Sequence, residues 1–247
     1  VLLATAFVFA GLPLSTPALA RNAAAADEEP GRWALLIGCE RYQLASPLQF
    51  TINDVRQLSE TLQARGGYEP GQILEITDEG EDASLQPLRA SLLEQLPEFL
   101  EKPGPNDQII VYFSGHGFRD DDGKMFLAPV DCDPANPVET AIPVEWFRDQ
   151  LASCRASFKL LVIDSCHAGS EKGADEDELV SAKDLGEPFR ALGDVITLAS
   201  STADEKSQIW AEKQQSLYSY WLNQGLKGHA DADGEQSAVV EAAYAAL

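Results

Sequence analysis

Two kinds of hydrophobic pattern alternate along the chain. Continuous or alternating apolar runs predict five strands, at residues 33–38, 73–76, 108–113, 159–163 and 194–200. Between them, apolar residues recur every three or four positions, which predicts helices at residues 53–66, 84–100, 143–153 and 217–226. The longest apolar runs are typical of parallel strands buried on both faces. Strands that alternate with helices predict a doubly wound α/β fold, a mostly parallel sheet with helices on both faces.

Residues 171–190 interrupt this pattern after the fourth predicted strand. They are rich in Asp and Glu and contain few apolar residues. Such a segment has little to bury, so we expect a mobile, solvated loop that is open to proteolysis. Its basic residues Lys172, Lys183 and Arg190 are the positions at which an enzyme specific for basic residues could cut it.

The ends of the chain predict roles outside the folded domain. Residues 1–20 are apolar and end in Ala-Leu-Ala, a sequence of the kind that signal peptidase cleaves, and so predict a secretory signal peptide. We expect an exported protein with no stable membrane span after cleavage. Residues 21–31 are Ala-rich and acidic and predict a linker before a domain at residues 32–229. Residues 230–247 predict the start of a C-terminal segment that is cut short.

The acidic composition indicates which kinds of molecule the protein can bind. The chain has 40 acidic and 18 basic residues and a formal net charge of −22. Nucleic acid and anionic membranes would repel such a protein, whereas a cationic substrate would be attracted. The alternative is that the acidity only keeps the protein soluble. Cys39, Cys132 and Cys154 have no patterned spacing and are expected to be small apolar residues, with one disulfide as an alternative, and no Cys/His cluster has zinc-ligand spacing.

Two of the predicted strands lead to reactive residues. The run at residues 159–163 precedes Cys166, and the run at 108–113 precedes His116. Because the carboxyl ends of parallel strands share one edge of a sheet, we expect Cys166 and His116 to meet there. A thiolate attacks a carbonyl, and a neighbouring imidazole favours the thiolate and later protonates the leaving amine. The two residues predict a catalytic dyad, while His167 should point to the opposite side and be a bystander.

The sequences around this pair resemble those of a known family. Residues 114–117 read Ser-Gly-His-Gly, residues 164–169 read Asp-Ser-Cys-His-Ala-Gly, and the histidine precedes the cysteine by 50 residues (116 to 166). Together they resemble the metacaspase branch of the caspase-like cysteine peptidases and its bacterial relatives, over residues 32–228. The resemblance implies a caspase-like doubly wound fold. It also implies a cysteine endopeptidase of a bacterium. Together with the predicted signal peptide, this gives an expected location in the periplasm, in the cell envelope or outside the cell.

The resemblance implies a role for particular residues. The N–H groups of Gly117 and Cys166 would form the oxyanion hole. Asp54, Ser114 and Asp164 would line a pocket for the Arg or Lys that precedes the cleaved bond. In an extended segment Asp164 lies on the same side as Cys166, which favours the pocket. Asp54 could instead only cap a helix, and Ser114 could only form a turn.

The glycines on either side of the histidine are a further feature of this motif. Gly115 and Gly117 are expected to allow backbone conformations that other residues resist. The alternative for His116 itself is a loop histidine that makes one backbone hydrogen bond.

Calcium and self-processing are also implied by the resemblance. Asp131 matches one calcium ligand of metacaspases, and Glu145 and Asp175 fall near the other expected positions. Calcium prefers several oxygen ligands, so the set looks incomplete and we expect calcium to be optional and no cofactor to be required. Residues 171–190 correspond to the loop that joins the large and small parts of caspase-like enzymes, where self-cleavage at Lys172 and the other basic residues above would occur.

The resemblance leaves rival functions open. We expect a monomer that acts on protein or peptide substrates with Arg or Lys before the cut, and no nucleic-acid partner. One rival is a non-catalytic caspase-like module that binds or regulates a partner. A second rival is a peptidase of the same fold that prefers a different residue before the cut.

Overall fold

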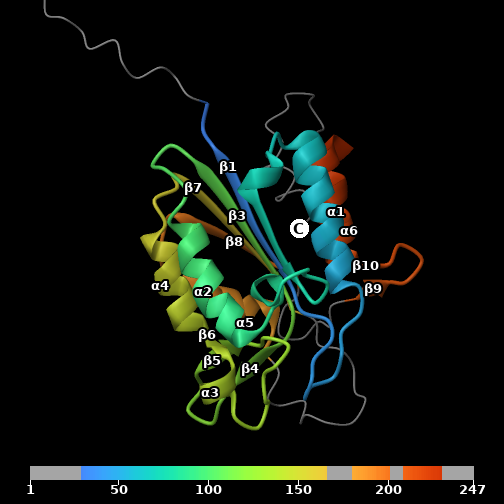
Figure 1. Ribbon diagram of the computed structural model, residues 1–247, viewed down its shortest axis with the longest axis vertical. Coiled ribbons are helices and arrows are strands. Elements are labelled where there is room, and N and C mark those ends of the chain that lie inside the picture. The colour runs from blue at the N-terminus through green and yellow to red at the C-terminus, as the bar shows by residue number, and fades with distance from the viewer. Residues whose placement is uncertain (1–28, 166–179, 201–207, 230–247) are drawn as a thin grey trace, which may run out of the picture.

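The computed structural model describes residues 29–165, 180–200 and 208–229 (Figure 1). The predicted signal peptide at residues 1–20, most of the predicted linker and residues 230–247 lie outside the described residues. Cys166, Lys172 and Asp175 also lie outside them.

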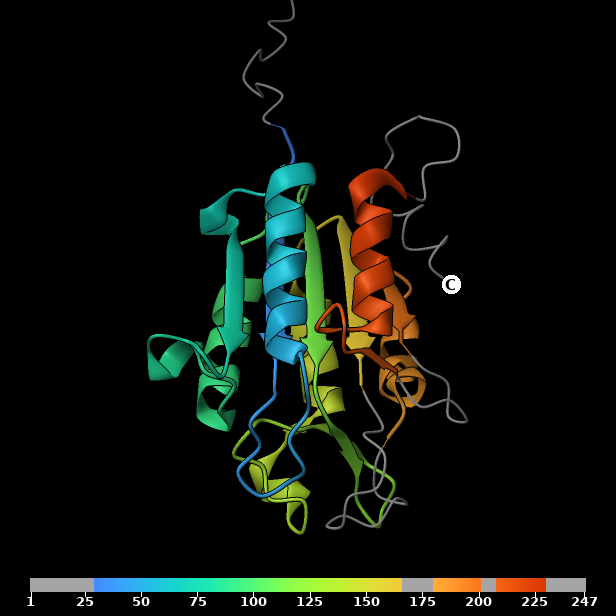
Figure 2. The same ribbon diagram turned by 90° about the vertical axis from the view of Figure 1, so that its right-hand side faces the viewer.

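A central sheet of five parallel strands organises the fold, in the order β2-β1-β3-β7-β8. The strands are β1 (Arg32–Gly38), β2 (Ile73–Thr77), β3 (Gln108–Ser114), β7 (Phe158–Asp164) and β8 (Val195–Ala199). They coincide with the five apolar runs and confirm the predicted parallel sheet. All five carboxyl ends therefore lie at one edge, the lower edge in Figures 1 and 2.

Helices cover both faces of this sheet, as predicted. Helices α1 (Thr51–Arg65) and α6 (Leu217–Gln224) lie side by side on one face, which faces the viewer in Figure 2. Helices α2 (Arg89–Leu100), α4 (Val144–Ser153) and α5 (Ala182–Arg190) lie on the other. Two hydrophobic cores result, because successive residues of a strand face opposite sides. In β3, Val111 belongs to the core under α2, α4 and α5, and Tyr112 to the core under α1 and α6.

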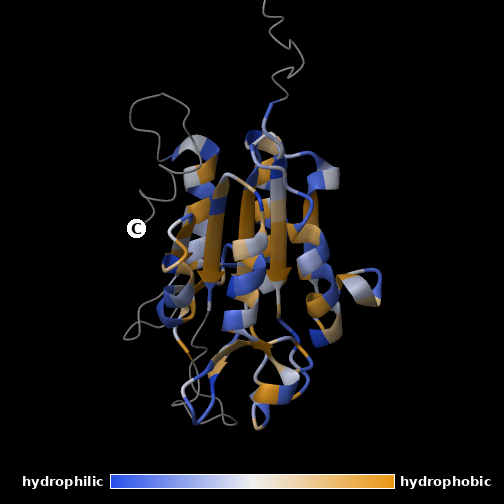
Figure 3. Ribbon diagram, turned by 90° about the vertical axis from the view of Figure 1, so that its left-hand side faces the viewer, coloured by the Kyte–Doolittle hydropathy of each residue, from blue (hydrophilic) through white to orange (hydrophobic). Residues whose placement is uncertain are grey.

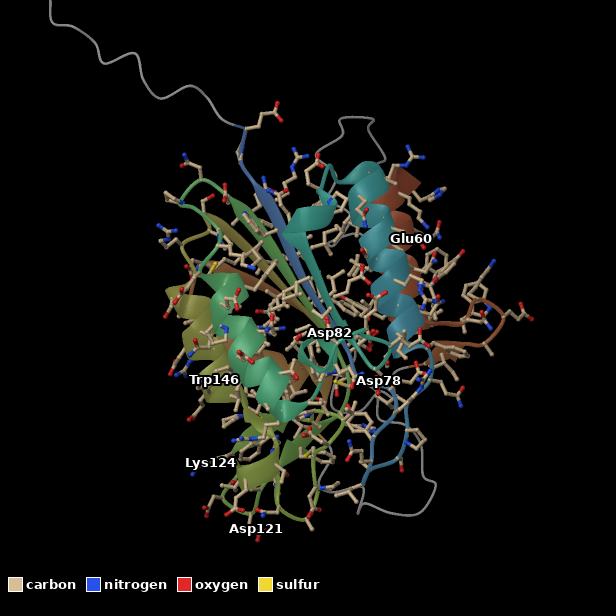
Figure 4. The ribbon with its side chains drawn as sticks, in the orientation of Figure 1. Glu60, Asp78, Asp82, Asp121, Lys124 and Trp146 are labelled. Atoms are coloured by element: carbon tan, nitrogen blue, oxygen red, sulfur yellow. The ribbon has the colours of Figure 1, made fainter. Side chains whose placement is uncertain are left out.

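The polarity of the elements follows from this layering. In Figure 3 the central strands are mostly hydrophobic, whereas the helices in front of them carry both hydrophobic and hydrophilic residues. Charged side chains project from the surface in Figure 4, among them Glu60 on α1 and Asp121 and Lys124 near the turn after β4. Of the helices in the described part of the chain, none is both long enough and apolar enough to cross a membrane.

Short elements complete the described structure. A second sheet, in the order β4-β5-β6, comprises β4 (Gly117–Arg119), β5 (Met125–Leu127) and β6 (Ile142–Pro143). Strands β9 (Ile209–Trp210) and β10 (Gln215–Ser216) form a hairpin before α6. The remaining elements are α3 (Pro137–Thr140), two 3-10 turns (Pro70–Gln72 and Ala83–Leu85) and a terminal turn (Gly225–His229). None of these runs is long enough to show a hydrophobic period in the sequence.

The structure corrects the prediction that residues 171–190 form a loop. Residues 182–190 are helix α5, which begins after Ser181, whose hydroxyl accepts the N–H of Asp184. Leu185 and Phe189 are four residues apart, so they share one face of α5, and both are fully buried. The abundance of acidic residues hid this short apolar face. Two of the proposed cleavage positions, Lys183 and Arg190, therefore lie in a helix.

The second predicted helix begins later than expected. A 3-10 turn occupies Ala83–Leu85, and α2 begins only at Arg89. Gln86, the residue before Pro87, is extended, as the proline ring requires of its predecessor. Pro97 lies inside α2, and the helix continues to Leu100.

Candidate active site

The strand order reverses between β1 and β3, which are neighbours although β2 lies between them in sequence. In doubly wound sheets, ligands bind beyond the carboxyl ends of the strands at such a point. Here the loop after β1 and the segment after β3 lie beside each other, and the second carries His116. Its side chain is buried, with 3% of the residue exposed.

The register of β3 and β7 relates the two predicted catalytic residues. These strands pair from Gln108 with Phe158 to Ser114 with Asp164. His116 follows Ser114 by two residues, and Cys166 follows Asp164 by two residues. The 50 residues that separate His116 from Cys166 therefore equal the 50 residues that separate paired positions of β3 and β7, such as Ser114 and Asp164. Cys166 lies outside the described residues, whereas its predecessor Ser165 is buried at the end of β7.

A backbone carbonyl orients the imidazole of His116. The Nε2 atom lies 2.8 Å from the carbonyl oxygen of Ser46, in the loop after β1. A carbonyl oxygen can only accept a hydrogen bond, so Nε2 carries the proton. In the neutral ring Nδ1 is then the basic nitrogen. A base whose second nitrogen is held by another group is the arrangement that activates a nucleophile.

The two glycines that flank His116 are required by close packing. Neither has a positive φ, so the expectation that they provide unusual backbone conformations was wrong. A Cβ on Gly115 would lie 2.8 Å from the hydroxyl oxygen of Tyr42. A Cβ on Gly117 would lie 2.5 Å from a methyl carbon of Leu185 in α5. Side chains at these positions would clash with the walls of the site.

Gly117, the expected oxyanion donor, lies at the start of β4 and pairs with β5. Ala128 donates its N–H to the carbonyl of His116, and Gly117 stands opposite Leu127 in the β4–β5 pair. Positions in an antiparallel pair alternate, so Gly117 is at a position without ladder hydrogen bonds. Its N–H is not used by β5, while its carbonyl accepts the N–H of Val180 at 3.0 Å. The other expected donor, Cys166, is outside the described residues.

Two buried carboxylates lie at the carboxyl end of the sheet, on the side of α1 and α6. Asp54 of α1 is 1% exposed and Asp164 of β7 is 0% exposed. Ser216 joins them: its N–H donates to Asp54 at 3.1 Å and its hydroxyl donates to Asp164 at 2.5 Å. Ser114 is buried and pairs in register with Asp164, so both occupy the same face of the sheet. The structure thus brings together the three residues expected to bind a basic side chain.

The environment of Asp54 makes ionisation costly. Burial, and then the charge of Asp164, raise the pKa of Asp54 to about 9, against the hydrogen bonds from Ser216. No ion pair to Asp54 occurs within residues 29–165, 180–200 and 208–229. Nor does Asp54 cap α1, because the N-cap residue is Phe50 and the carboxylate bonds to Ser216 instead. Strongly shifted pKa values of this kind are common at functional sites.

The raised pKa of Asp54 predicts a pH effect on stability. Between about pH 4 and pH 9 this carboxyl is protonated in the folded protein and ionised in the unfolded chain, so folding binds one extra proton. Its contribution to the free energy of unfolding is complete below about pH 4 and is lost as the pH rises towards 9. We expect the free energy of unfolding, measured by urea denaturation, to fall as the pH rises. The fall should be steeper for the parent than for Asp54→Asn, by up to about 1.4 kcal/mol per pH unit. Parallel slopes would contradict the raised pKa.

Sequence reasoning missed three residues that surround the Asp54 and Asp164 carboxylates. Besides Ser216, the hydroxyl groups of Ser219 and Tyr112 lie 3.2 and 3.4 Å from the carboxylate of Asp164. Strand β10 of the hairpin contacts α1 and α6 (Figure 2), and its last residue, Ser216, directly precedes α6. The only sequence signal was a serine before a helical pattern, because Ser216 caps α6 by accepting the N–H of Ser219. That signal indicates a cap and says nothing of a pocket.

The described residues do not supply a calcium site around Asp131. Its carboxylate accepts the N–H of Arg89, the first residue of α2, at 2.9 Å. Such a contact stabilises a helix N-terminus. Glu145 lies in the first turn of α4, and Asp175 is outside the described residues. No group of three or more His, Cys, Asp or Glu suited to a metal occurs in the part of the chain that the structure describes.

The three cysteines other than Cys166 are buried free thiols. Burial raises the pKa of Cys132 to about 11 and also raises the pKa of Cys39 and Cys154. The thiolate is the reactive form of cysteine, so these residues are poor nucleophiles. The prediction that they are small buried residues is confirmed, and the alternative of a disulfide among them is wrong.

The fold and the motifs together define the class of α/β cysteine peptidases with a caspase-like sheet. The chain belongs to the caspase domain family, whose family model matches residues 31–243. This confirms the resemblance noted in the sequence. It also confirms the caspase-like form of the fold.

Individual relatives agree with this membership. Metacaspase-1 of Yarrowia lipolytica is 31% identical over 146 residues, which cover 56% of this chain and 31% of that protein. Metacaspase-1A of Aspergillus niger is 30% identical over 148 residues, which cover 56% of this chain and 36% of that protein. The match thus spans about a third of the length of these curated relatives. A crystal structure of a Geobacter sulfurreducens protein shares the fold, with a TM-score of 0.55, 14% identity and coverage of 81% of this chain and 83% of that chain.

Proposed function

We propose that the protein is a cysteine endopeptidase that cleaves after Arg or Lys, with Cys166 as nucleophile and His116 as base. The observation that carries the proposal is the geometry of His116. It is buried at the carboxyl edge of the sheet, its Nε2 is held by Ser46, and it follows the Ser114–Asp164 pair by two residues. Cys166 follows Asp164 by the same two residues, so we expect it at the same edge of the sheet.

The residues support the following sequence of steps. Nδ1 of His116 takes the proton of the Cys166 thiol, and the thiolate attacks the carbonyl carbon of the substrate. The negative oxygen that forms accepts hydrogen bonds from the N–H groups of Gly117 and Cys166. The C–N bond then breaks, and the imidazolium returns its proton to the leaving amine. His116 next takes a proton from water, which hydrolyses the thioester and releases the acid product and the free thiol.

The carboxylate pair supports the preference for a basic residue. Arg or Lys would bring a positive charge next to buried Asp54, whose carboxylate accepts hydrogen bonds from the uncharged backbone N–H of Ser216. A guanidinium group offers several donors in one plane and suits two neighbouring carboxylates. Ser114, Ser216 and Ser219 would line the same pocket.

A panel of fluorogenic peptides tests the proposal against its rivals. The peptides differ only in the residue before the reporter, which is Arg, Lys, Asp or Ala. The proposed enzyme hydrolyses the Arg and Lys peptides. A non-catalytic module would hydrolyse none of them, and a peptidase with another preference would favour Asp or Ala.

We also propose that calcium is not required for this activity. The proposal rests on Asp131, whose carboxylate is used at the N-terminus of α2. Turnover of the Arg peptide should change less than about twofold when a chelator is added, since a hard cation needs several oxygen ligands that the described residues do not provide. Loss of turnover in the chelator and its recovery in millimolar calcium would show that residues such as Asp175 complete a site.

Self-processing is proposed at Lys172. Lys183 and Arg190 lie in α5, and cleavage there would require the helix to open first. Incubation of the active protein should give a new N-terminus at Gly173, detected by gel and N-terminal sequencing. The Cys166→Ala protein, as control, should stay intact. An active chain that remains uncut after long incubation would contradict self-processing.

A further inference from the structure

Tyr42 bridges two segments at the base of the site. It lies in the loop after β1 and is 8% exposed. Its hydroxyl accepts the backbone N–H of His116 at 2.8 Å and donates to the carbonyl of Ala128 at 3.2 Å. Ala128 in turn donates its own N–H to the carbonyl of His116. The backbones of His116 and Ala128 are therefore joined by one direct hydrogen bond, from the Ala128 N–H, and by a second link in which the Tyr42 hydroxyl bridges the His116 N–H and the Ala128 carbonyl.

The ring of Tyr42 also packs on the ring of His116. The two centroids are 4.6 Å apart, with an angle of 43° between the planes. Phe118 lies further away, at 6.1 Å from the imidazole centroid. Gly115 makes this approach feasible, because a Cβ there would collide with the Tyr42 hydroxyl. Tyr42 thus fixes both the backbone and the ring plane of His116.

The loop that carries Tyr42 is itself held at several points. The carboxylate of Asp78, at the end of β2, accepts the N–H groups of Glu40 and Arg41 at 2.9 Å each (Figure 4). On the other side of Tyr42, Gln43 donates its N–H to Val130 at 2.8 Å. The same loop supplies the carbonyl of Ser46 to Nε2. A loop anchored on both sides of Tyr42 can hold His116 rigidly.

We propose that Tyr42 is the positioning residue for His116. The inference rests on the proposed function of His116 as base and adds a residue that acts through His116. Tyr42 holds the imidazole by three contacts: the hydrogen bond to the His116 N–H, the bridge to Ala128, and the ring contact. A base displaced by about 1 Å loses on the order of a hundredfold in rate, so loss of these contacts should slow the chemical step and leave substrate binding unchanged.

Tyr42→Phe tests the inference by removing one oxygen atom. The hydroxyl is lost while the ring contact remains. We expect kcat for the Arg peptide to fall on the order of tenfold to a hundredfold, with KM within about twofold of the parent. Gly115→Ala should also lower kcat, because the added Cβ would displace the Tyr42 hydroxyl without removing it. Turnover is expressed per active site titrated with an Arg chloromethyl ketone, which counts only folded, reactive molecules.

Two matched variants serve as controls. Tyr68→Phe removes the hydroxyl of a tyrosine that is 4% exposed but lies on the α1 side of the sheet. Gly71→Ala adds a methyl group in open space. Both should keep the kcat of the parent. If Tyr42→Phe and Gly115→Ala also keep the kcat of the parent, Tyr42 is an ordinary core residue and the inference is wrong. The inference is also wrong if these variants raise KM while kcat stays constant.

The outcome for Tyr42 is separable from that for the proposed function. The proposed function fails if the parent hydrolyses no peptide, or if His116→Ala is as active as the parent. The inference about Tyr42 fails alone if the parent is active, His116→Ala is inactive, and Tyr42→Phe matches the parent in both kcat and KM.

Discussion

Replacing either member of the dyad should abolish peptide hydrolysis. We expect Cys166→Ala and His116→Ala each to lower kcat for Arg and Lys peptides by about a thousandfold or more, as is usual when one half of a nucleophile and base unit is removed. The physical reason is that the thiol is a weak nucleophile until a base at Nδ1 removes its proton. The rate is measured on purified protein with the fluorogenic peptides.

Two further variants separate chemistry from folding. His116 is buried and its Nε2 is bonded to Ser46, so His116→Ala also removes packing. His116→Gln retains an amide that can donate to Ser46, yet it lacks a base and should be as inactive as His116→Ala. His167→Ala, next to the nucleophile, should retain nearly full turnover. Turnover of Cys166→Ala close to that of the parent would refute the dyad.

Asp164→Asn should sharply reduce cleavage after Arg and Lys. Asp164 is fully buried, and its carboxylate accepts hydrogen bonds from Ser216, Ser219 and Tyr112. A buried cation without its carboxylate costs a few kcal/mol, so kcat/KM should fall on the order of a hundredfold or more. Asp121→Asn is the matched control, because it makes the same change at the surface (Figure 4).

Comparing the loss of kcat/KM of Asp164→Asn on different peptides shows whether Asp164 acts by binding a basic side chain. We expect the Ala peptide to be a poor substrate of the parent and to be affected much less than the Arg peptide. An equal loss on all peptides would indicate damage to the fold instead of to the pocket. Preferred cleavage of the Asp peptide by the parent would refute a pocket for basic residues.

The sequence predicted the sheet well, for a physical reason. A parallel strand buried on both faces must be apolar throughout, so β3 and β7 stand out as unbroken runs. Reactive residues just beyond such runs must lie at the carboxyl edge. The motif spacing of 50 residues even equals the register of the β3–β7 pair. His116, Ser114 and Asp164 could therefore be assigned to one edge of the sheet without a structure, whereas Asp54, which lies on α1, was assigned there only by the family resemblance.

The parts that could not be predicted depend on contacts distant in sequence. Helix α5 has only a few apolar residues, and its burial against Gly117 becomes visible only in three dimensions. Ser216 reaches Asp54 through a hairpin whose strands have two residues each. The same holds for Tyr42, which follows β1 in a loop with no hydrophobic period. The two glycines beside His116 were noticed, but their reason is steric contact and not backbone conformation.

Covalent trapping tests the central claim most directly. An Arg chloromethyl ketone is incubated with the protein, and the alkylated residue is located by peptide mapping in a mass spectrometer. The account predicts one adduct, on Cys166, which forms rapidly in the parent, slowly in His116→Ala, and slowly in the parent when Asp replaces Arg in the reagent. An adduct on Cys39, Cys132 or Cys154, or equal rates with the Arg and Asp reagents, would contradict it.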